Sequence, residues 1–307
     1  MRKMLVAVAA FGLLLTACAG NENPVVTTSA GGGTETSATP ATAAACAEQS
    51  SVPYVSQGNL TIGTDNPAYP PWYAGGDTQG TNWKINNPAT GKGFESAVAY
   101  AVADKLGFST DQVQWVEVPF NQSFAPGPKS FDFDINQISY TPKRAQAVDF
   151  SESYYDVNPA LVALKGTPIT QAASLSDLKD FSLASQIGTT DYDYIVNVIQ
   201  PNAEAGAYNS LADAVQALKS GNVDGIVVDL PTAFYVTAVQ IPNGVIVGQF
   251  PPAGGQQEYF AMAFAKGNAL VQCVNMALEE LKSEGTLQSI QDQWLSSKVS
   301  VPVFSTS

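Results

Sequence analysis

Hydrophobic residues along this chain follow two alternating periods, which predict strands and helices in turn. Short apolar runs typical of strands lie at 60–64, 113–118, 160–164 and 223–228. Apolar residues spaced three and four positions apart predict helices over 94–106, 211–218 and 270–281. Because strands and helices alternate, we expect α/β lobes with largely parallel sheets.

The N-terminus carries the pattern of a secretory signal. Arg2 and Lys3 precede a mostly apolar run over residues 4–17, which is shorter than the roughly 20 residues that a membrane-spanning helix needs. Small residues end this run directly before Cys18, and the arrangement resembles the lipobox of bacterial lipoproteins. We therefore expect a signal peptide over residues 1–17, lipidation of Cys18, and an extracytoplasmic protein that is lipid-anchored to the cell membrane. The alternative is an ordinary signal peptide with an incidental cysteine.

Residues 19–45 consist mainly of Thr, Ser, Ala, Gly and Pro, without an aromatic residue or an apolar periodicity. Such a stretch cannot bury enough surface to offset its ordering entropy. We assign residues 18–54 to the lipidated Cys18 and a flexible tether that holds the folded body off the membrane.

The charge balance and the residue inventory exclude several functional classes. The 307 residues include 14 Lys and Arg against 27 Asp and Glu, a formal net charge of -13, which argues against a nucleic-acid partner. The chain has no histidine, and its three cysteines form no CxxC pair, so we expect neither a metal site nor a cofactor. GxSxG, HExxH, P-loop and GxGxxG motifs are also absent from the sequence.

A series of motifs follows one order along the body of the chain. They are Ile62-Gly63-Thr64-Asp65, Tyr69-Pro70-Pro71-Trp72, Gly93-Phe94-Glu95, Ser139-Tyr140-Thr141-Pro142-Lys143-Arg144, Gly188-Thr189-Thr190 and Val223–Asp229. Their order and spacing resemble the polar amino-acid-binding proteins of ABC importers, which are bacterial extracellular solute-binding proteins of family 3. The resemblance implies an α/β, two-lobed, periplasmic-binding-protein-like type II fold with a central ligand cleft, in a monomer.

The same resemblance places the lobe boundaries. Lobe one is expected over residues 55–157 together with 250–307, and lobe two over residues 158–249. Two strand-like crossings between the lobes would fall near 155–159 and 247–251.

The resemblance also assigns residues to the carboxylate of an amino-acid ligand. Arg144 would hold this carboxylate with its planar fork of donors, and Ser139 would hydrogen-bond beside it. Gln137 stands near them, where the family often has Ser, Thr or Gly. Thr189 and Thr190 would open a helix whose backbone N–H groups favour an anion.

Asp229 follows an apolar strand and matches the family's partner for the ligand ammonium. Each of these assignments has a plainer alternative. Arg144 would then be a surface arginine after a turn, the threonine pair would only cap a helix, and Asp229 would be a solvated turn residue.

Tyr69 and Phe120 match two aromatic positions that flank the ligand side chain, although either ring would also suit a plain core. Asp65 then remains as an extra carboxylate near Tyr69. Because an unpaired carboxylate is unfavourable, it would seek a donor from the ligand side chain. This favours an amide or a cationic side chain over Glu and Asp. The alternative is that Asp65 caps the following turn.

Cys46 and Cys273 are the remaining thiols once Cys18 is lipidated, and the mature protein faces an oxidising compartment. Cys273 lies on the apolar face of a late helix, and Cys46 lies where the tether meets the body. We predict a disulfide between them. The alternative is a buried free cysteine at 273 and an exposed one at 46.

The resemblance implies a solute-binding lipoprotein that captures a polar amino acid and delivers it to the membrane subunits of an ABC transporter. One rival is an extracytoplasmic enzyme on the same fold, in which Asp65 and Asp229 would do acid–base work. Another is a binding subunit that feeds a sensor.

Overall fold

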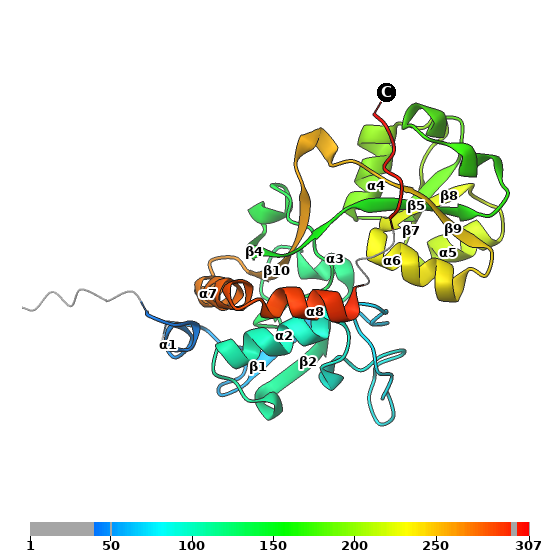
Figure 1. Cartoon of the computed structure of the whole chain (residues 1–307). Helices are drawn as coiled ribbons and strands as arrows, with labels where there is room; N and C mark the ends of the chain where they lie inside the picture. The colour runs from blue at the N-terminus through cyan, green and yellow to red at the C-terminus, as the bar shows by residue number, and fades with distance from the viewer. Residues whose placement is uncertain (1–39, 50, 296–299, 307) are drawn as a thin grey trace, which may run out of the picture. The chain divides into compact units, whose positions relative to one another are not determined.

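The computed structural model describes residues 40–49, 51–295 and 300–306. The expected signal peptide and the expected lipidation site at Cys18 lie outside these residues. The described chain forms two lobes with one five-stranded sheet each, which confirms the predicted α/β, two-lobed fold (Figure 1). In these ranges, no helix has both the length and the apolar character needed to cross a membrane.

Both sheets are formed from strands that are far apart in the sequence. The lobe-one sheet has the order β2-β1-β3-β10-β4, with strands β1 (Leu60–Thr64), β2 (Val113–Glu117), β3 (Phe133–Asp134), β4 (Val148–Val157) and β10 (Glu258–Ala265). The lobe-two sheet has the order β7-β6-β8-β5-β9, with strands β5 (Pro159–Leu164), β6 (Leu183–Gln186), β7 (Gly206–Tyr208), β8 (Gly225–Asp229) and β9 (Gly244–Gln249). The α-helices of the described residues are α1 (Ala43–Ala47), α2 (Phe94–Lys105), α3 (Phe120–Ser123), α4 (Thr190–Tyr194), α5 (Leu211–Lys219), α6 (Leu230–Tyr235), α7 (Leu270–Ser283) and α8 (Thr286–Trp294).

The sheets are mixed, so the prediction of largely parallel sheets was wrong. In lobe one β1 pairs in parallel with β2 and β3, whereas β10 runs antiparallel to β3 and β4. Lobe two repeats this plan, with β6 parallel to β7 and β8 and with β5 antiparallel to β8 and β9. The antiparallel strands β5 and β10 each follow a crossing from the other lobe. They enter at the end where the parallel strands finish, and they therefore run in the opposite direction.

Lobe one is built around large aromatic side chains. The ring centroid of Trp72 lies 5.9 Å from that of Phe94 and 5.5 Å from that of Phe260, and all three residues are buried. Helices α2, α7 and α8 pack against one another over this core. Edge-to-face contacts of this kind stabilise a core beyond the area that they bury.

Lobe two has a core on each face of its sheet. Strand β5 is buried on both faces of the sheet. Because successive side chains of a strand point to opposite sides, its residues enter two different clusters. Ala160 and Val162 join a cluster with helix α5, whereas Leu161 and Ala163 join a second cluster that contains Phe250. The continuous apolar run in the sequence reflects this two-sided burial.

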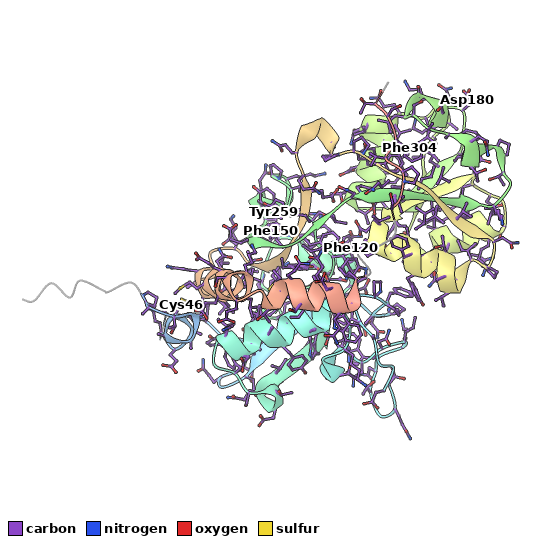
Figure 2. The ribbon with its side chains drawn as sticks, in the orientation of Figure 1. Cys46, Phe120, Phe150, Asp180, Tyr259 and Phe304 are labelled. Carbon is purple, nitrogen blue, oxygen red and sulfur yellow. A yellow bond between two sulfur atoms is a disulfide. The ribbon has the colours of Figure 1, made fainter. Side chains whose placement is uncertain are left out.

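The end of the chain packs on lobe two, although the sequence assigned all of residues 250–307 to lobe one. Phe304 stacks on Phe250 with ring centroids 4.9 Å apart, and its N–H donates to the carbonyl of Gln249 at 3.0 Å (Figure 2). Gly248 leaves the space for the ring, because a Cβ at that position would lie 2.7 Å from it. The lobe-one assignment was therefore wrong for this last segment, since a contact between distant residues decides its place.

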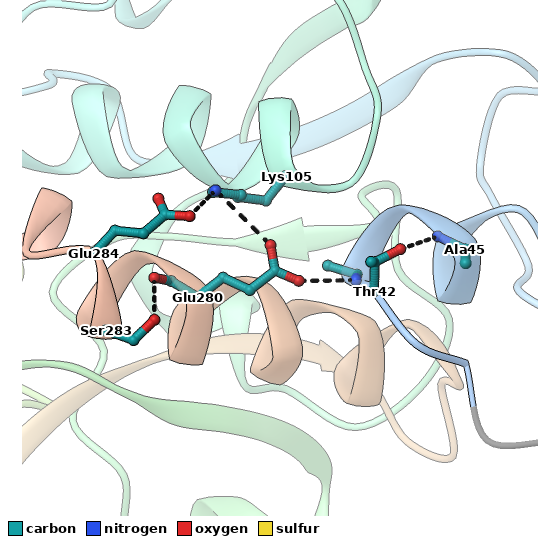
Figure 3. A network of polar contacts seen from close by, with 7 residues as sticks. Thr42, Ala45, Lys105, Glu280, Ser283 and Glu284 are labelled. Atoms are coloured by element: carbon teal, nitrogen blue, oxygen red, sulfur yellow. Dashed lines mark hydrogen bonds and ion pairs between the residues drawn. The ribbon is translucent and has the colours of Figure 1, made fainter.

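The last part of the expected tether also belongs to the folded body. Helix α1 begins after Thr42, and the N–H of Ala43 donates to Glu280 of α7 at 3.1 Å (Figure 3). Lys105 of α2 approaches Glu280 at 3.8 Å and Glu284 at 2.6 Å, so α1, α2 and α7 share one polar network. The tether assigned to residues 18–54 was too long at its C-terminal end.

A disulfide joins α1 to α7, as predicted. Cys46 and Cys273 are both buried, their Cα atoms lie 5.3 Å apart, and 227 positions separate them in the sequence. The bond fixes the start of the folded body to a helix of lobe one.

Candidate ligand-binding site

A cavity of about 610 Å³ is lined by residues of both lobes, where parallel strands of both sheets end. Asp65 directly follows β1 and Asp229 is the last residue of β8, so both carboxylates reach the cavity from strand ends. Most of the residues predicted to bind ligand line this cavity, namely Asp65, Tyr69, Phe120, Gln137, Thr189, Thr190 and Asp229.

Arg144 and Ser139 lie beside the cavity and not on its lining. Arg144 is 8% exposed, and its Nη1 donates to the carbonyl of Ser139 at 2.6 Å while its Nη2 donates to that of Gly188 at 2.8 Å. Its guanidinium carbon lies 4.2 Å from the centroid of the Phe124 ring, which is cation–π geometry. Burial lowers the pKa of Arg144 to about 10, so the side chain keeps its charge at neutral pH.

Polar contacts beside the cavity join the two lobes. The hydroxyl oxygens of Ser139 in lobe one and Thr190 in lobe two are 3.2 Å apart. The indole N–H of Trp72 donates to the hydroxyl of Thr232 in α6 at 2.9 Å. Together with the bond from Arg144 to Gly188, these contacts join the parts of both lobes that lie beside the cavity.

The sequence left two roles open for Thr189 and Thr190, which are helix capping and contact with a ligand. The geometry suits Thr189 to the first role and Thr190 to the second. The hydroxyl of Thr189 accepts from the N–H of Tyr192 at 3.1 Å and donates to the carbonyl of Gln186 at 2.7 Å, so this residue caps α4. Thr190 contacts Ser139 across the lobes and lines the cavity, which leaves its hydroxyl beside the space for a ligand.

Gln137 is held in place by a buried carboxyl group. Its φ of 48° lies in the left-handed region, which is uncommon for a residue with a Cβ. Its N–H donates to Glu95 Oε1 at 2.6 Å, its side-chain amide donates to the other oxygen, and Tyr154 also donates to Glu95. Glu95 is fully buried, and this burial raises its pKa to about 7. Gln137 therefore joins the cavity wall to the core of lobe one.

Asp65 is half-buried at the cavity, and one of its oxygens accepts from the N–H of Asn66 at 2.7 Å. The turn-capping alternative thus holds for that oxygen. Burial raises the pKa of Asp65, and the bond from Asn66 opposes this rise. The carboxylate still lines the cavity, as the ligand-contact interpretation requires.

The two predicted aromatic rings lie on the cavity wall beside other rings. Tyr69 has its ring centroid 6.3 Å from that of Tyr235 in α6, and Phe120 packs edge-on against Phe124 at 5.3 Å. The guanidinium of Arg144 lies 5.6 Å from the Phe120 ring. Phe120 thus touches both the cavity and the arginine behind it.

Asp191 is a lining residue that the sequence analysis missed. It lies in the first turn of α4, is 6% exposed, and its Oδ1 has no hydrogen-bond partner in the described parts of the chain. The signal was present, because an acidic residue directly follows the Thr189-Thr190 pair. Nothing in the local pattern distinguished it from a solvated acid in a first helical turn, which is common.

Comparisons with known proteins agree with this fold. The model of the bacterial extracellular solute-binding proteins, family 3, matches residues 60–297. The arginine-binding extracellular protein ArtP of Bacillus subtilis (strain 168) is 27% identical over 205 residues, which cover 66% of this chain and 77% of that protein. The solved structure of an ancestral arginine-binding protein bound to arginine is 30% identical, with a TM-score of 0.64 over 78% of this chain and 99% of that one.

A second solved structure is the ancestral amino acid-binding protein AncCDT-1, described as a precursor of cyclohexadienyl dehydratase. It is 27% identical, with a TM-score of 0.62 over 78% of this chain and 96% of that one. The extent of the family match and the two-lobed fold show that this chain belongs to the bacterial extracellular solute-binding proteins, family 3.

Proposed function

We propose that this protein is a lipid-anchored, extracytoplasmic solute-binding protein that captures a basic amino acid and delivers it to an ABC transporter. The observation that carries the proposal is the acidity of the cavity between the lobes. Asp65, Asp191 and Asp229 line it, whereas Lys84 is the one cation among the described lining residues. Carboxylates that are removed from water need positive partners, and a basic amino acid supplies two.

Each charged group of such a ligand has a partner at the cavity. The side-chain cation would meet Asp65 on lobe one, with Tyr69 along its apolar stem. The α-carboxylate would meet the hydroxyl of Thr190 on the lining, with the positive charge of Arg144 behind it, and the α-ammonium would meet Asp229. Because these partners are divided between the lobes, a bound ligand would favour the closed arrangement over an open one.

The similarity to arginine-binding proteins supports arginine as the first candidate. ArtP is named as an arginine-binding protein, and the ancestral relative holds arginine in its solved structure. An acidic amino acid would place its side-chain carboxylate beside that of Asp65 and is therefore disfavoured. A neutral amide such as glutamine can donate to Asp65 but brings no charge, and charge-assisted hydrogen bonds are about twice as strong as neutral ones.

Isothermal titration of the wild-type protein tests the ligand class. We expect L-arginine or L-lysine to bind at least about tenfold more tightly than L-glutamine, which corresponds to about 1.4 kcal/mol. L-glutamate is expected to be the weakest of the four. A protein that binds L-glutamate or L-aspartate most tightly would contradict the proposal. NMR of the solute after incubation addresses the enzymatic alternative, because a binding protein returns its ligand unchanged.

The membrane anchor is proposed from the sequence alone and needs its own experiment. Replacing Cys18 with Ala should move the protein from the detergent-soluble membrane fraction to the aqueous fraction, because a lipid chain stabilises the membrane-bound state. Wild-type protein that is already fully aqueous would remove the anchor from the proposal without affecting the ligand class.

A further inference from the structure

Asp191 is a buried acid whose position is not explained by its own helix. It lies in the first turn of α4, lines the cavity, and is 6% exposed. An aspartate there often caps a helix, but α4 is already capped by Thr189, whose hydroxyl accepts from the N–H of Tyr192. Asp191 Oδ1 is buried and has no hydrogen-bond partner in the described chain. An unpaired buried carboxylate oxygen is costly, so its retention beside a cavity needs another reason.

The charged groups around Asp191 come from three other elements. Asp229 ends β8, Glu258 begins β10, and Arg144 lies in the short helical turn before β4. Burial and then Glu258 raise the pKa of Asp191 well above its ordinary value, while Arg144 opposes the rise. Asp193, on the same helix, is exposed. The group thus contains three buried or half-buried carboxyls and one guanidinium.

Arg144 does not neutralise this group by a direct ion pair. Its Nη1 and Nη2 donate to the carbonyls of Ser139 and Gly188, and none of the ion pairs in the described ranges includes Arg144, Asp191 or Asp229. Glu258 Oε1 is likewise buried without a partner in the chain as described. Two of these carboxyls, those of Asp191 and Asp229, line the cavity from lobe two, and no ion pair in the described ranges neutralises them.

We propose that Asp191 and Asp229 form a two-carboxylate subsite on lobe two that takes the α-ammonium of the bound solute. The inference rests on the proposed function, because it assigns a second residue to one end of the same basic ligand. An ammonium has three N–H donors, so it can bond to two carboxylates at once. The paired carboxylates would make recognition of the ammonium stronger than recognition of the neighbouring carboxylate, which Asp191 repels.

Thermodynamic cycles with two ligands test this subsite. The probes are L-arginine and its desamino analogue, in which hydrogen replaces the α-ammonium and the rest of the molecule is unchanged. For Asp191→Asn we expect at least about tenfold weaker binding of L-arginine, because one charge-assisted hydrogen bond is lost. The desamino analogue should bind Asp191→Asn as well as the wild type or better, because a carboxylate that repels its own carboxylate has gone.

Asp193→Asn is the matched control, since it removes an exposed carboxylate from the same turn and should leave both affinities unchanged. If Asp191→Asn unfolds at a lower temperature, Asp191→Ser provides a second variant with the same expected pattern. Equal losses for L-arginine and the desamino analogue, or no loss for either, would overturn the subsite.

The titration of the wild-type protein distinguishes a failure of the proposed ligand class from a failure of the subsite. If wild-type protein binds neither L-arginine nor L-lysine, the basic-amino-acid proposal fails. The subsite is then tested with agmatine and putrescine, which carry ammonium groups and no carboxylate. Tenfold weaker binding of either amine by Asp191→Asn supports the subsite. Unchanged binding, or no binding of either amine by the wild type, overturns it.

Discussion

Lobe one and lobe two bury different kinds of side chains in their interiors. Lobe one encloses aromatic rings such as Trp72 and Phe94 together with three fully buried acids, Glu95, Asp132 and Asp134. Lobe two encloses mainly aliphatic side chains on both faces of its sheet, and Phe304 from the chain's end completes one of these faces.

The difference extends to the way in which each lobe presents polar groups to the cavity. In lobe one, Glu95 holds Gln137 through its N–H and its amide, so the cavity wall is bonded to the core behind it. In lobe two, Asp191 reaches the cavity with an oxygen that no group of the described chain satisfies. Lobe one also contains buried polar atoms without a partner in the described chain, among them both oxygens of Asp134. Asp134 does not line the cavity, whereas Asp191 does, so the unsatisfied acid that a ligand can reach belongs to lobe two.

The largest effect is expected where lobe two depends on the end of the chain. Phe304→Ala should lower the free energy of unfolding by about 3–5 kcal/mol, because it removes a buried ring that stacks on Phe250. Urea denaturation measures the change. Val303→Ala is the control, since Val303 is 57% exposed and should cost under about 0.5 kcal/mol. If both variants cost the same, lobe two is complete without this segment.

A slightly smaller effect is expected from Glu95, one of the buried acids of lobe one. The pKa of Glu95 is about 7 in the fold, against 4.5 in its ordinary state, so the folded protein binds more protons than the unfolded chain between these values. The resulting stabilisation is present below pH 4.5 and is lost as the pH rises through 7, by up to about 3 kcal/mol.

Glu95→Gln tests this pH dependence because it keeps the shape of the side chain and cannot ionise. Urea denaturation at about pH 5 and about pH 8 should show a loss of stability at the higher pH for the wild type and a smaller loss for Glu95→Gln. Identical pH profiles would mean that Glu95 stays ionised, and lobe one would then hold an unneutralised buried charge.

Breaking the disulfide should have a moderate effect on lobe one. Replacing Cys46 and Cys273 by Ser should lower the free energy of unfolding by about 2 kcal/mol, at the lower end of the usual range. The reason is that α1 is short and can detach while the rest of lobe one stays folded. Proteolysis should then cut near α1 first. Equal protection of α1 in the variant would show that the bond to Glu280 and the buried alanines suffice.

The smallest effect concerns the acid that lobe one contributes to the cavity. Asp65→Asn should weaken L-arginine about tenfold, or about 1.4 kcal/mol, and should leave L-glutamine nearly unchanged, because an amide can still donate to Asn. Asp77→Asn serves as control, since Asp77 is exposed in the following loop. An unchanged order of ligand preference would make Asp65 a turn residue only, through its bond to Asn66.

Local patterns in the sequence were sufficient to indicate several residues that line the cavity. Asp65 and Asp229 were expected at the cavity because each follows a short apolar strand, and the structure has both at strand ends that line it. The two-lobed fold was implied by the resemblance of the ordered motifs to a known family. The disulfide was predicted from the number and positions of the cysteines, and it is present. These features depend on residue type and spacing, which can be read directly from the sequence.

Contacts between distant segments decided the rest. The place of Phe304 depends on Phe250 and on the space above Gly248, and no spacing in the sequence reveals this packing. The position of Arg144 behind the cavity depends on the carbonyl of Gly188 in the other lobe. Asp191 looks like any solvated acid until the fold buries it beside Asp229 and Glu258. Burial and electrostatic neighbours are properties of the assembled lobes, so only the tertiary structure determines which acids must find a partner.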